Sequence, residues 1–464
     1  MRDLSALIKA YDVRGVVPEQ WGPELAQQAG TAFVEVLGIR SVDGGAGQIV
    51  VGHDMRPTGP DLVAAFIDGV TAAGVDVINI GLCSTDGLYF ASGRLDIPGA
   101  MFTASHNPAE YNGIKLCRAG AAPVGQDSGL ADIRTMLESE EFPAYNGPVG
   151  TATEQDMLTD YANHLRALVP LEDIRELSVV IDTGNGMGGF TVPAVLGGQI
   201  LQPLPLQIDE MYFELDGSFP NHEANPIDPE NLRDLQKRVV EVGADIGLAF
   251  DGDADRCFVV DEKGDIVDPS TLTSLIATRE LAKHPGSTII HNLITSKAVP
   301  EIVKEHGGVP VRTRVGHSFI KATMAETGAI FGGEHSGHFY FRDFWKADSG
   351  MLAAMHALAA LGETPDGTTL STLLTPFSRY VSSGEINTTV ADAKAVTANI
   401  EKIFAAQGAQ FDHLDGLTVT GPNWWFNVRA SNTEPLLRLN VEGDDAAAME
   451  LIRDQVLALM KDGV

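Results

Sequence analysis

The stretch Ile246-Gly-Leu-Ala-Phe-Asp-Gly-Asp-Ala-Asp-Arg256 places a short apolar run directly before three acidic residues at alternate positions. Such a run, bounded by turn-forming residues, predicts a buried strand. Similar runs end near residues 51, 181 and 290, each beside an alanine-rich helical pattern. Strands that alternate with helices predict α/β units, which bind ligands at the carboxyl ends of their strands. We therefore expect the chemistry in the loops that follow these runs.

The strand-and-turn pattern occurs three times, near residues 48–58, 177–189 and 287–297, and this indicates one α/β unit used three times. The last part differs and predicts a smaller α+β domain, with a strand, a helix over 391–407, strands over 424–428 and 436–441, and a helix over 446–461. A Pro- and Gly-containing linker is expected over 139–154. The predicted domains are residues 1–150, 151–264, 265–374 and 375–464.

Composition narrows the class of protein. The chain has 464 residues, 44% of them hydrophobic, and a net charge of −31, so we expect a soluble protein without a nucleic-acid partner. An anionic substrate would need local arginines or a bound cation to offset that charge.

Three scattered cysteines fit neither a disulfide framework nor a zinc site. The N-terminus lacks a signal peptide, and the longest apolar run, 351–361, is too short to cross a bilayer. We expect a cytoplasmic monomer or homodimer that binds a small molecule and no membrane.

A polar loop follows the apolar pair Met101-Phe102 and contains Ser105, His106 and, further on, Lys115. A serine beside a base can act as a nucleophile or carry a phosphate. An ordinary loop, whose Ser and Asn side chains only satisfy backbone groups, is the plainer interpretation. The nucleophile elbow of α/β-hydrolases is not met, because it needs glycine two residues on either side of the serine.

The three carboxylates of Asp251, Asp253 and Asp255 would point the same way on an extended chain and could then bind a divalent cation. An EF-hand is excluded, because Arg256 stands where the sharp turn needs glycine and strands are predicted on both sides. A solvated acidic turn without metal is the alternative.

Glu334, Ser336 and His338 alternate in a glycine-rich loop and could hydrogen-bond the hydroxyls of a sugar. Zinc binding by Glu334, His335 and His338 is a weaker alternative, because no further ligand is supplied locally.

A second polar loop has the donors that a phosphate group accepts, namely Arg429, Ser431, Asn432 and Thr433, with Arg438 on the strand that follows. A plain turn is the alternative here. The stretch Gly184–Gly189 matches the G-x-G-x-x-G pattern of dinucleotide sites, but the acidic residue expected after it, Asp209, falls in an irregular Pro-rich stretch.

Together with Tyr11-Asp-Val-Arg-Gly15, these loops occur in an order that resembles the α-D-phosphohexomutase family over nearly the whole chain. The resemblance implies three similar mixed-sheet α/β domains, followed by a smaller α+β C-terminal domain, around a central cleft. It implies that Ser105 carries the catalytic phosphate and that Mg²⁺ is bound by Asp251, Asp253, Asp255 and phospho-Ser105.

The resemblance also assigns roles to the remaining loop residues. Arg14, His106 and Lys115 would assist proton movement and steady charge, and Arg256 would lie beside the metal. The sugar would contact Glu334, Ser336, His338, His317 and Lys297. The distal phosphate would be bound by Arg429, Ser431, Asn432, Thr433 and Arg438.

The implied activity is an intramolecular phosphotransfer that interconverts hexose 1-phosphate and hexose 6-phosphate through a hexose 1,6-bisphosphate. Mannose phosphate is the expected substrate and glucose phosphate a close second, because the sequences of the acidic and sugar loops look most like those of bacterial phosphomannomutases. His335 departs from the commoner family patterns, which bears on the preferred sugar. A phosphoglucosamine mutase, a metal-dependent sugar phosphatase and a non-catalytic sugar-phosphate sensor are the alternatives.

Overall fold

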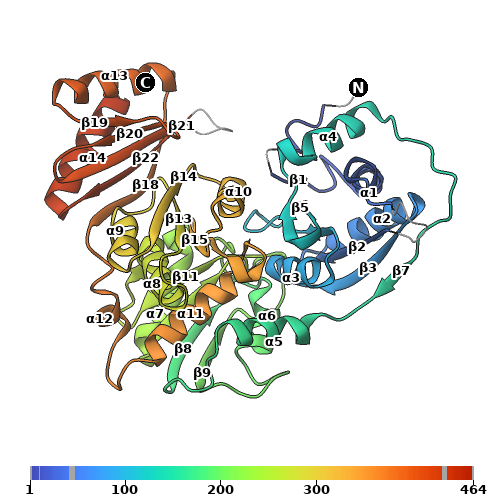
Figure 1. Cartoon of the computed structure of the whole chain (residues 1–464), viewed down its shortest axis with the longest axis horizontal. Coiled ribbons are helices and arrows are strands. Elements are labelled where there is room, and N and C mark those ends of the chain that lie inside the picture. The colour runs from blue at the N-terminus through green and yellow to red at the C-terminus, as the bar shows by residue number, and fades with distance from the viewer. Residues whose placement is uncertain (1–2, 10, 41–46, 431–435, 462–464) are drawn as a thin grey trace. The chain divides into compact units, whose positions relative to one another are not determined.

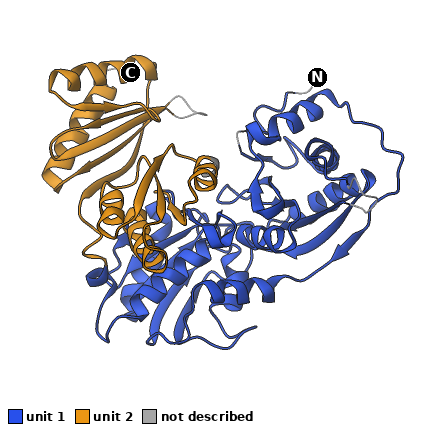
Figure 2. Cartoon of the chain, viewed as in Figure 1, with its two compact units in different colours: residues 1–267, 336–373 blue, residues 268–335, 374–464 orange. Residues whose placement is uncertain are grey.

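The computed structural model describes residues 3–9, 11–40, 47–430 and 436–461, and Figure 1 shows its helices and strands. The chain forms two compact units, shown in different colours in Figure 2. Unit 1 consists of residues 1–267 and 336–373, and unit 2 consists of residues 268–335 and 374–464.

The first sheet of unit 1 has the strand order β1-β5-β4-β2-β3-β7, with β6 paired to β5. Strands β2, β3, β4 and β7 run parallel, whereas β5 runs antiparallel to both β4 and β1. The strands are β1 (Val13–Val16), β2 (Gly47–His53), β3 (Val75–Leu82), β4 (Gly99–Phe102), β5 (Tyr111–Arg118), β6 (Ala122–Pro123) and β7 (Ala152–Glu154).

Helices cover both faces of this sheet. Alternate residues of a strand point to opposite faces, so neighbouring residues of β2 contact different helices. Ile49 and Val51 of β2 belong to the core formed with α1 (Pro23–Leu37), α2 (Gly59–Ala72) and α4 (Leu130–Ser139). Val50, between them, lies on the other face with Leu88 of α3 (Thr85–Leu95), where both side chains surround Gly99.

The second sheet of unit 1 has the order β12-β11-β10-β8-β9. Its strands are β8 (Leu177–Asp182), β9 (Leu206–Met211), β10 (Ile246–Phe250), β11 (Cys257–Asp261) and β12 (Ile266–Val267). All five residues of β10 are buried, as expected for a central strand with both faces covered. The helices are α5 (Leu158–Leu168), α6 (Gly188–Val195), α7 (Arg233–Val242) and α11 (Gly350–Gly362), and an antiparallel pair, β16 (Phe339–Phe341) and β17 (Ala347–Asp348), also belongs to unit 1.

Unit 2 begins with three parallel strands, in which β13 (Thr288–Asn292) lies between β14 (Val309–Thr313) and β15 (Phe331–Gly333). Helices α8 (Pro269–Lys283), α9 (Ala298–Glu305) and α10 (His317–Thr327) accompany them. Helix α12 (Leu370–Leu374), which lies in unit 1 except for its last residue, precedes the C-terminal part. The C-terminal sheet is antiparallel in the order β18-β22-β21-β20-β19, with α13 (Ala393–Ala406) and α14 (Ala446–Lys461). Its strands are β18 (Val381–Thr389), β19 (Gln410–Asp412), β20 (Leu417–Thr420), β21 (Trp424–Ala430) and β22 (Leu436–Gly443).

The predicted fold class is confirmed, with mixed α/β sheets followed by an α+β C-terminal part. Some elements were not predicted. Strands β19 and β20 were missed, because they are only three and four residues long. The expected linker over 139–154 ends in the exposed edge strand β7, and Asp209 lies in β9 rather than in an irregular stretch. The division into four domains stays a prediction.

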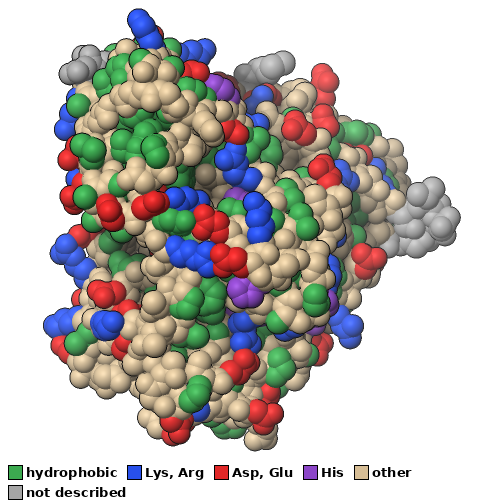
Figure 3. Space-filling view, turned by 60° about the vertical axis from the view of Figure 1, so that its left-hand side comes forward, with side chains coloured by type: hydrophobic (Ala, Val, Ile, Leu, Met, Phe, Trp, Pro, Cys, Tyr) green, Lys and Arg blue, Asp and Glu red, His purple; other side chains and the backbone are tan. Residues whose placement is uncertain are grey.

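Charged side chains of both signs are interspersed on the face drawn in Figure 3. Within residues 3–9, 11–40, 47–430 and 436–461, every helix is too short or too polar to cross a membrane.

The pair α1 and α2 packs with unusually close backbones, which depends on glycine at two contacts. A Cβ on Gly30 would lie 2.3 Å from the backbone oxygen of Phe66, and a Cβ on Gly69 would lie 2.0 Å from that of Gln27. Because backbone atoms cannot move aside cheaply, a side chain at either position forces the helices apart.

We therefore expect Gly30→Ala to lower the free energy of unfolding by about 1–3 kcal/mol, despite the better helix propensity of alanine. Gly22→Ser is the matched control, because nothing lies within 4 Å of a Cβ there and serine is a good residue at this helix-capping position. Thermal and urea unfolding measure both variants. Equal stability of the two would contradict the close packing.

Candidate active site

The loop that carries Ser105 is organised by the buried side chain of Arg56. Its guanidinium pairs with Asp54 at 3.3 Å and donates hydrogen bonds of 2.6–2.9 Å to the backbone carbonyls of Ser105, Asn107, Pro108 and Tyr111. Sequence reasoning missed Arg56, although it follows the end of β2, where strand-end chemistry is expected. Four carbonyls held by one cation fix the shape of this loop.

Ser105 itself is buried, with 1% of its surface exposed, and not presented on an open loop. Its backbone has a φ of +50°, a left-handed conformation that costs energy for a residue other than glycine. Its Oγ donates to Oδ2 of Asp251 at 2.8 Å, accepts from Nη2 of Arg256 at 3.2 Å and lies 3.1 Å from Nδ1 of His106. The hydroxyl therefore lies between a carboxylate, a guanidinium and an imidazole.

The three predicted carboxylates cluster, with ligand atoms of Asp251, Asp253 and Asp255 all within 4.8 Å of one another. The chain is not extended here, because the loop is a turn in which Ala254 has a φ of +59°. The turn gathers the carboxylates more tightly than an extended strand would. It lies between β10 and β11, which rules out the helical flanks of an EF-hand.

The cluster has the features of a divalent-cation site. All three carboxylates are at most 1% exposed, which contradicts the alternative of a solvated acidic turn. Within the part of the chain that the structure describes, Oδ1 of Asp253 and Oδ1 of Asp255 have no hydrogen-bond partner. Buried acceptors without donors are costly, and a cation bound by oxygen would satisfy them.

Two cations of the chain already offset part of this negative charge. Nζ of Lys115 lies 2.7 Å from Asp253 and 2.6 Å from Asp255, and Nε of Arg256 lies 3.2 Å from Asp251. Burial alone would lower the pKa of Lys115, but the charges of Asp253 and Asp255 outweigh it and hold that pKa well above its usual value. Lys115 is therefore a fixed positive charge beside the cluster.

The pKa values of two further groups are shifted toward the neutral forms. Burial, with the charges of Asp255 and Asp253, raises the pKa of Asp251 to about 8. Burial, with the nearby cations Arg256 and Arg14, lowers the pKa of His106 well below its ordinary range. A neutral imidazole has one ring nitrogen free to accept a proton, as a base beside a hydroxyl requires.

Arg14 and His338 are also placed near this centre. Arg14 pairs with Asp12 at 2.6 Å and donates to Oδ1 of Asn107 at 2.7 Å, which ties β1 to the serine loop.

Nδ1 of His338 lies 3.1 Å from Asp348 and 3.8 Å from Asp255. The predicted alternation from Glu334 to His338 does not persist, because Gly337 turns the chain with a φ of +83°.

Three of the predicted sugar residues, Glu334, Lys297 and His317, belong to unit 2. Glu334 is 2% exposed, and its Oε1 accepts from Nδ2 of Asn292 at 3.3 Å and from the backbone of Gly316 at 3.2 Å. Nζ of Lys297 pairs with Asp444 at 2.6 Å. His317 begins α10, and its side chain lies outside what the structure describes.

The zinc alternative gains no support. Among the described residues, two groups of three side chains could bind a metal ion, and His335 belongs to neither. The groups are Asp251, Asp253 and Asp255, and Asp255, His338 and Asp348.

Two of the predicted phosphate ligands, Arg429 and Arg438, lie directly opposite each other on β21 and β22. Arg429 lies 3.8 Å from Glu385 and 3.5 Å from Asp415, and Arg438 lies 3.4 Å from Glu385. These carboxylates partly neutralise the pair, so an incoming phosphate would compete with them. Ser431, Asn432 and Thr433 lie outside the described residues.

The glycine-rich stretch Gly184–Gly189 packs against the carboxylate loop. The backbone N–H of Met187 donates to the carbonyl of Gly252 at 2.8 Å, and a Cβ on Gly186 would lie 2.6 Å from the same oxygen. Asp209, the acidic residue considered for a ribose, instead pairs with Arg238 at 2.6 Å. These contacts give the glycines a packing role and speak against a dinucleotide site.

Four family models match consecutive parts of the chain. Models for the alpha/beta/alpha domains I, II and III and for the C-terminal domain of phosphoglucomutase/phosphomannomutase match residues 5–144, 159–264, 268–380 and 385–459. A phosphomannomutase of Salmonella montevideo is 39% identical over 456 residues, which are 97% of this chain and 98% of that relative. A phosphomannomutase of Escherichia coli K12 is 38% identical over 457 residues, which are 98% of each chain.

A solved structure is similar over the same length. The phosphoglucomutase/phosphomannomutase family protein from Burkholderia thailandensis is 31% identical, with a TM-score of 0.86, and the match covers 100% of this chain and 98% of that one.

The raised pKa of Asp251 predicts that metal binding releases a proton. Below about pH 8 the metal-free carboxyl is protonated, and a divalent cation must displace that proton. We expect the affinity for Mg²⁺ to rise with pH up to about pH 8 and then to level off, with roughly one proton released per metal at neutral pH. Calorimetry in buffers of different ionisation enthalpy measures this, and an affinity that stays constant from about pH 6 to about pH 9 would contradict it.

Proposed function

The chain belongs to the phosphoglucomutase/phosphomannomutase family, and from this membership we propose that it interconverts hexose 1-phosphate and hexose 6-phosphate through a phosphorylated Ser105. It is an isomerase of the phosphomannomutase/phosphoglucomutase type. The single observation that supports this role of Ser105 is the 2.8 Å hydrogen bond from its Oγ to Asp251, inside the carboxylate cluster.

The proposed reaction has two phosphoryl transfers. In the first, the bond between phosphorus and Oγ of phospho-Ser105 breaks and Oγ takes up a proton, while phosphorus forms a new bond to the free hydroxyl oxygen of the hexose monophosphate, whose proton goes to a base. In the second, Oγ of Ser105 gives up its proton and takes the other phosphate of the resulting hexose 1,6-bisphosphate, and the sugar oxygen that loses this phosphate takes up a proton. Positioning and charge stabilisation supply most of the catalysis in such transfers.

The residues around Ser105 are suited to these steps. Arg256 donates to Oγ at 3.2 Å and would continue to balance charge on a phosphorylated serine. Lys115 brings a positive charge, and neutral His106 is a candidate base for the proton of the sugar hydroxyl. Burial would lower the pKa of His338, but the carboxylates of Asp255 and Asp348 raise it, so His338 is the candidate to donate a proton. Asp251, Asp253 and Asp255 would bind Mg²⁺, which supplies electrostatic stabilisation of the transferring phosphoryl group.

We assign further substrate contacts to residues of unit 2. Glu334 is oriented by Asn292 and Gly316 and would accept hydrogen bonds from sugar hydroxyls. Arg429 and Arg438, with Ser431, Asn432 and Thr433, would bind the phosphate that is not reacting. We propose mannose phosphate as the first substrate, on the strength of the phosphomannomutase relatives, and glucose phosphate as the second.

The experiment that tests this function is a coupled assay with Mg²⁺ on mannose 1-phosphate, glucose 1-phosphate and glucosamine 1-phosphate. We expect conversion to the 6-phosphate, fastest with mannose, dependent on a 1,6-bisphosphate activator and free of inorganic phosphate. Release of phosphate without an activator would instead indicate the sugar phosphatase, and preference for glucosamine would indicate the phosphoglucosamine mutase.

Ser105→Ala should abolish turnover, because no hydroxyl remains to carry the phosphate. Mass spectrometry of the wild-type protein should find a phosphate on Ser105 after incubation with the bisphosphate. Ser139→Ala, at the end of α4, is the control and should retain full activity. If Ser105→Ala kept more than a few per cent of wild-type turnover, the phosphoserine mechanism would fail.

Arg429→Ala should lower kcat/KM by roughly one to two orders of magnitude, because it removes a charge-assisted contact to the distal phosphate. Free bisphosphate should also accumulate, since a loosely bound intermediate can leave before the second transfer. Arg453→Ala, which removes an arginine that pairs with its neighbour Asp454 on α14, serves as the control. Wild-type kinetics in Arg429→Ala would refute the phosphate assignment.

A further inference from the structure

The first turn of α3 contacts the carboxylate cluster through a residue that no step of the proposed reaction uses. Thr85 is fully buried. Its Oγ1 donates to Oδ2 of Asp253 at 2.5 Å, and its backbone N–H donates to the carbonyl of Asp253 at 3.0 Å. Two hydrogen bonds to one residue restrain both the backbone and the carboxylate of Asp253.

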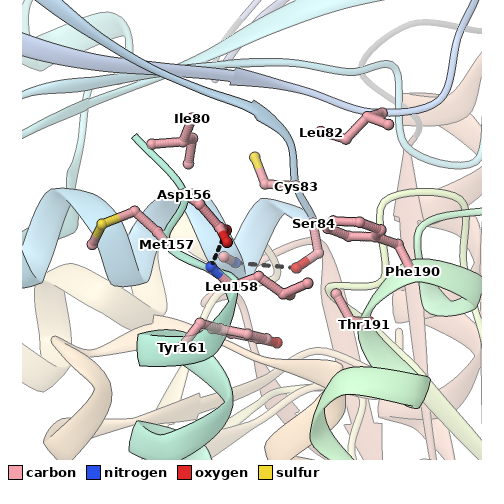
Figure 4. Close-up of a pocket in the computed structure, with 11 residues that line it drawn as sticks. Ile80, Leu82, Cys83, Ser84, Asp156, Met157, Leu158, Tyr161, Phe190 and Thr191 are labelled. Carbon is pink, nitrogen blue, oxygen red and sulfur yellow. Dashed lines mark hydrogen bonds between the residues drawn. The ribbon is translucent and has the colours of Figure 1, made fainter. Parts of the chain in front are cut away.

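The turn that carries Thr85 is itself anchored from several directions. The carboxylate of Asp86 accepts hydrogen bonds from the hydroxyls of Ser84, of Tyr161 on α5 at 2.8 Å and of Ser349, which caps α11, at 2.6 Å. Ser84 also caps α3, because its Oγ accepts from the backbone of Gly87 at 3.1 Å. Figure 4 shows Ser84 and Tyr161 among the residues that line the pocket beside this turn.

The two oxygens of Asp253 are therefore unlike each other. Oδ2 accepts from both Thr85 and Lys115, at 2.5 Å and 2.7 Å. Oδ1 is buried and, among the described residues, has no hydrogen-bond partner. Rotation of the carboxylate would exchange the two oxygens, and the hydrogen bond from Thr85 opposes that rotation.

We propose that Thr85 is a positioning residue for the metal site, which holds Oδ2 of Asp253 so that Oδ1 is presented to the divalent cation. This inference rests on the metal site proposed above. Outer hydrogen bonds of this kind orient metal-binding carboxylates, and their loss commonly costs about 10–100-fold in metal affinity. A merely structural role for Thr85 would lower stability and leave metal affinity unchanged.

Thr85→Val and Thr85→Ser separate these roles, because valine keeps the branched shape without the donor and serine keeps the donor. Mn²⁺ binding to the metal-free protein, followed by electron paramagnetic resonance, reports the site directly and does not depend on turnover. We expect Thr85→Val to weaken Mn²⁺ binding about tenfold or more and to raise the Mg²⁺ concentration for half-maximal activity to the same extent. The KM for sugar should change less than about twofold, and Thr85→Ser should restore metal affinity.

Two further variants complete the design. Thr191→Val is the matched control, because Thr191 is also buried and lines the pocket beside the α3 turn, while its hydroxyl donates to the backbone carbonyl of Met187 and not to the carboxylate cluster. Thr85→Ala removes the same donor with less steric demand and replaces Thr85→Val if that variant does not fold.

The outcomes are distinct. Wild-type Mn²⁺ affinity in a folded Thr85→Val or Thr85→Ala protein would overturn the inference and leave the proposed function intact. Equal loss in Thr191→Val would also overturn it, because the effect would then be one of packing. Absence of Mn²⁺ binding by the wild-type protein would overturn the metal site itself, and the inference with it.

Discussion

The rest of the site depends on one constraint: the negative charge of three buried carboxylates must be offset by nearby positive charge. Asp251, Asp253 and Asp255 lie within 4.8 Å of one another and are excluded from water, so their mutual repulsion is weakly screened. Lys115 and Arg256 offset part of the charge, but burial, with the charges of Asp255 and Asp253, still raises the pKa of Asp251. The two positive charges of a divalent ion would balance the two negative charges of a phosphate on Ser105.

The loop that carries Ser105 is held by the same kind of balance. Arg56 is buried with its partner Asp54 and donates to four backbone carbonyls of that loop. A buried guanidinium is costly unless most of its N–H groups find acceptors, so the loop and the arginine require each other. This mutual requirement keeps Ser105 in a left-handed backbone conformation that an isolated loop would avoid. The strain in the serine backbone is thus supported by contacts made elsewhere in the first sheet.

Much of the site could be predicted from local sequence. The run Ile246–Phe250 predicted a strand with acidic residues at its carboxyl end, and both features are present. The polar loop after Met101-Phe102 likewise predicted the place of Ser105, His106 and Lys115. Where the sequence interpretation failed, the elements were short or polar. Strands β19 and β7 have three residues each, and pairing with a neighbouring strand, not their own apolar pattern, makes them strands.

What the sequence determined by itself is the order of strands, helices and loops, because hydrophobic periodicity and turn residues act within a few positions of the chain. It also determined which residue types follow each strand. What only the tertiary structure decided is which of those residues meet. Ser105 and Asp251 are 146 positions apart in the sequence, and Thr85 and Asp253 are 168 apart, yet hydrogen bonds join each pair in the folded unit 1. No local pattern encodes such contacts, since they depend on burial and on charges brought from separate segments. For that reason Arg56 and Thr85, which look ordinary in the sequence, emerge as supports of the site only in the folded chain.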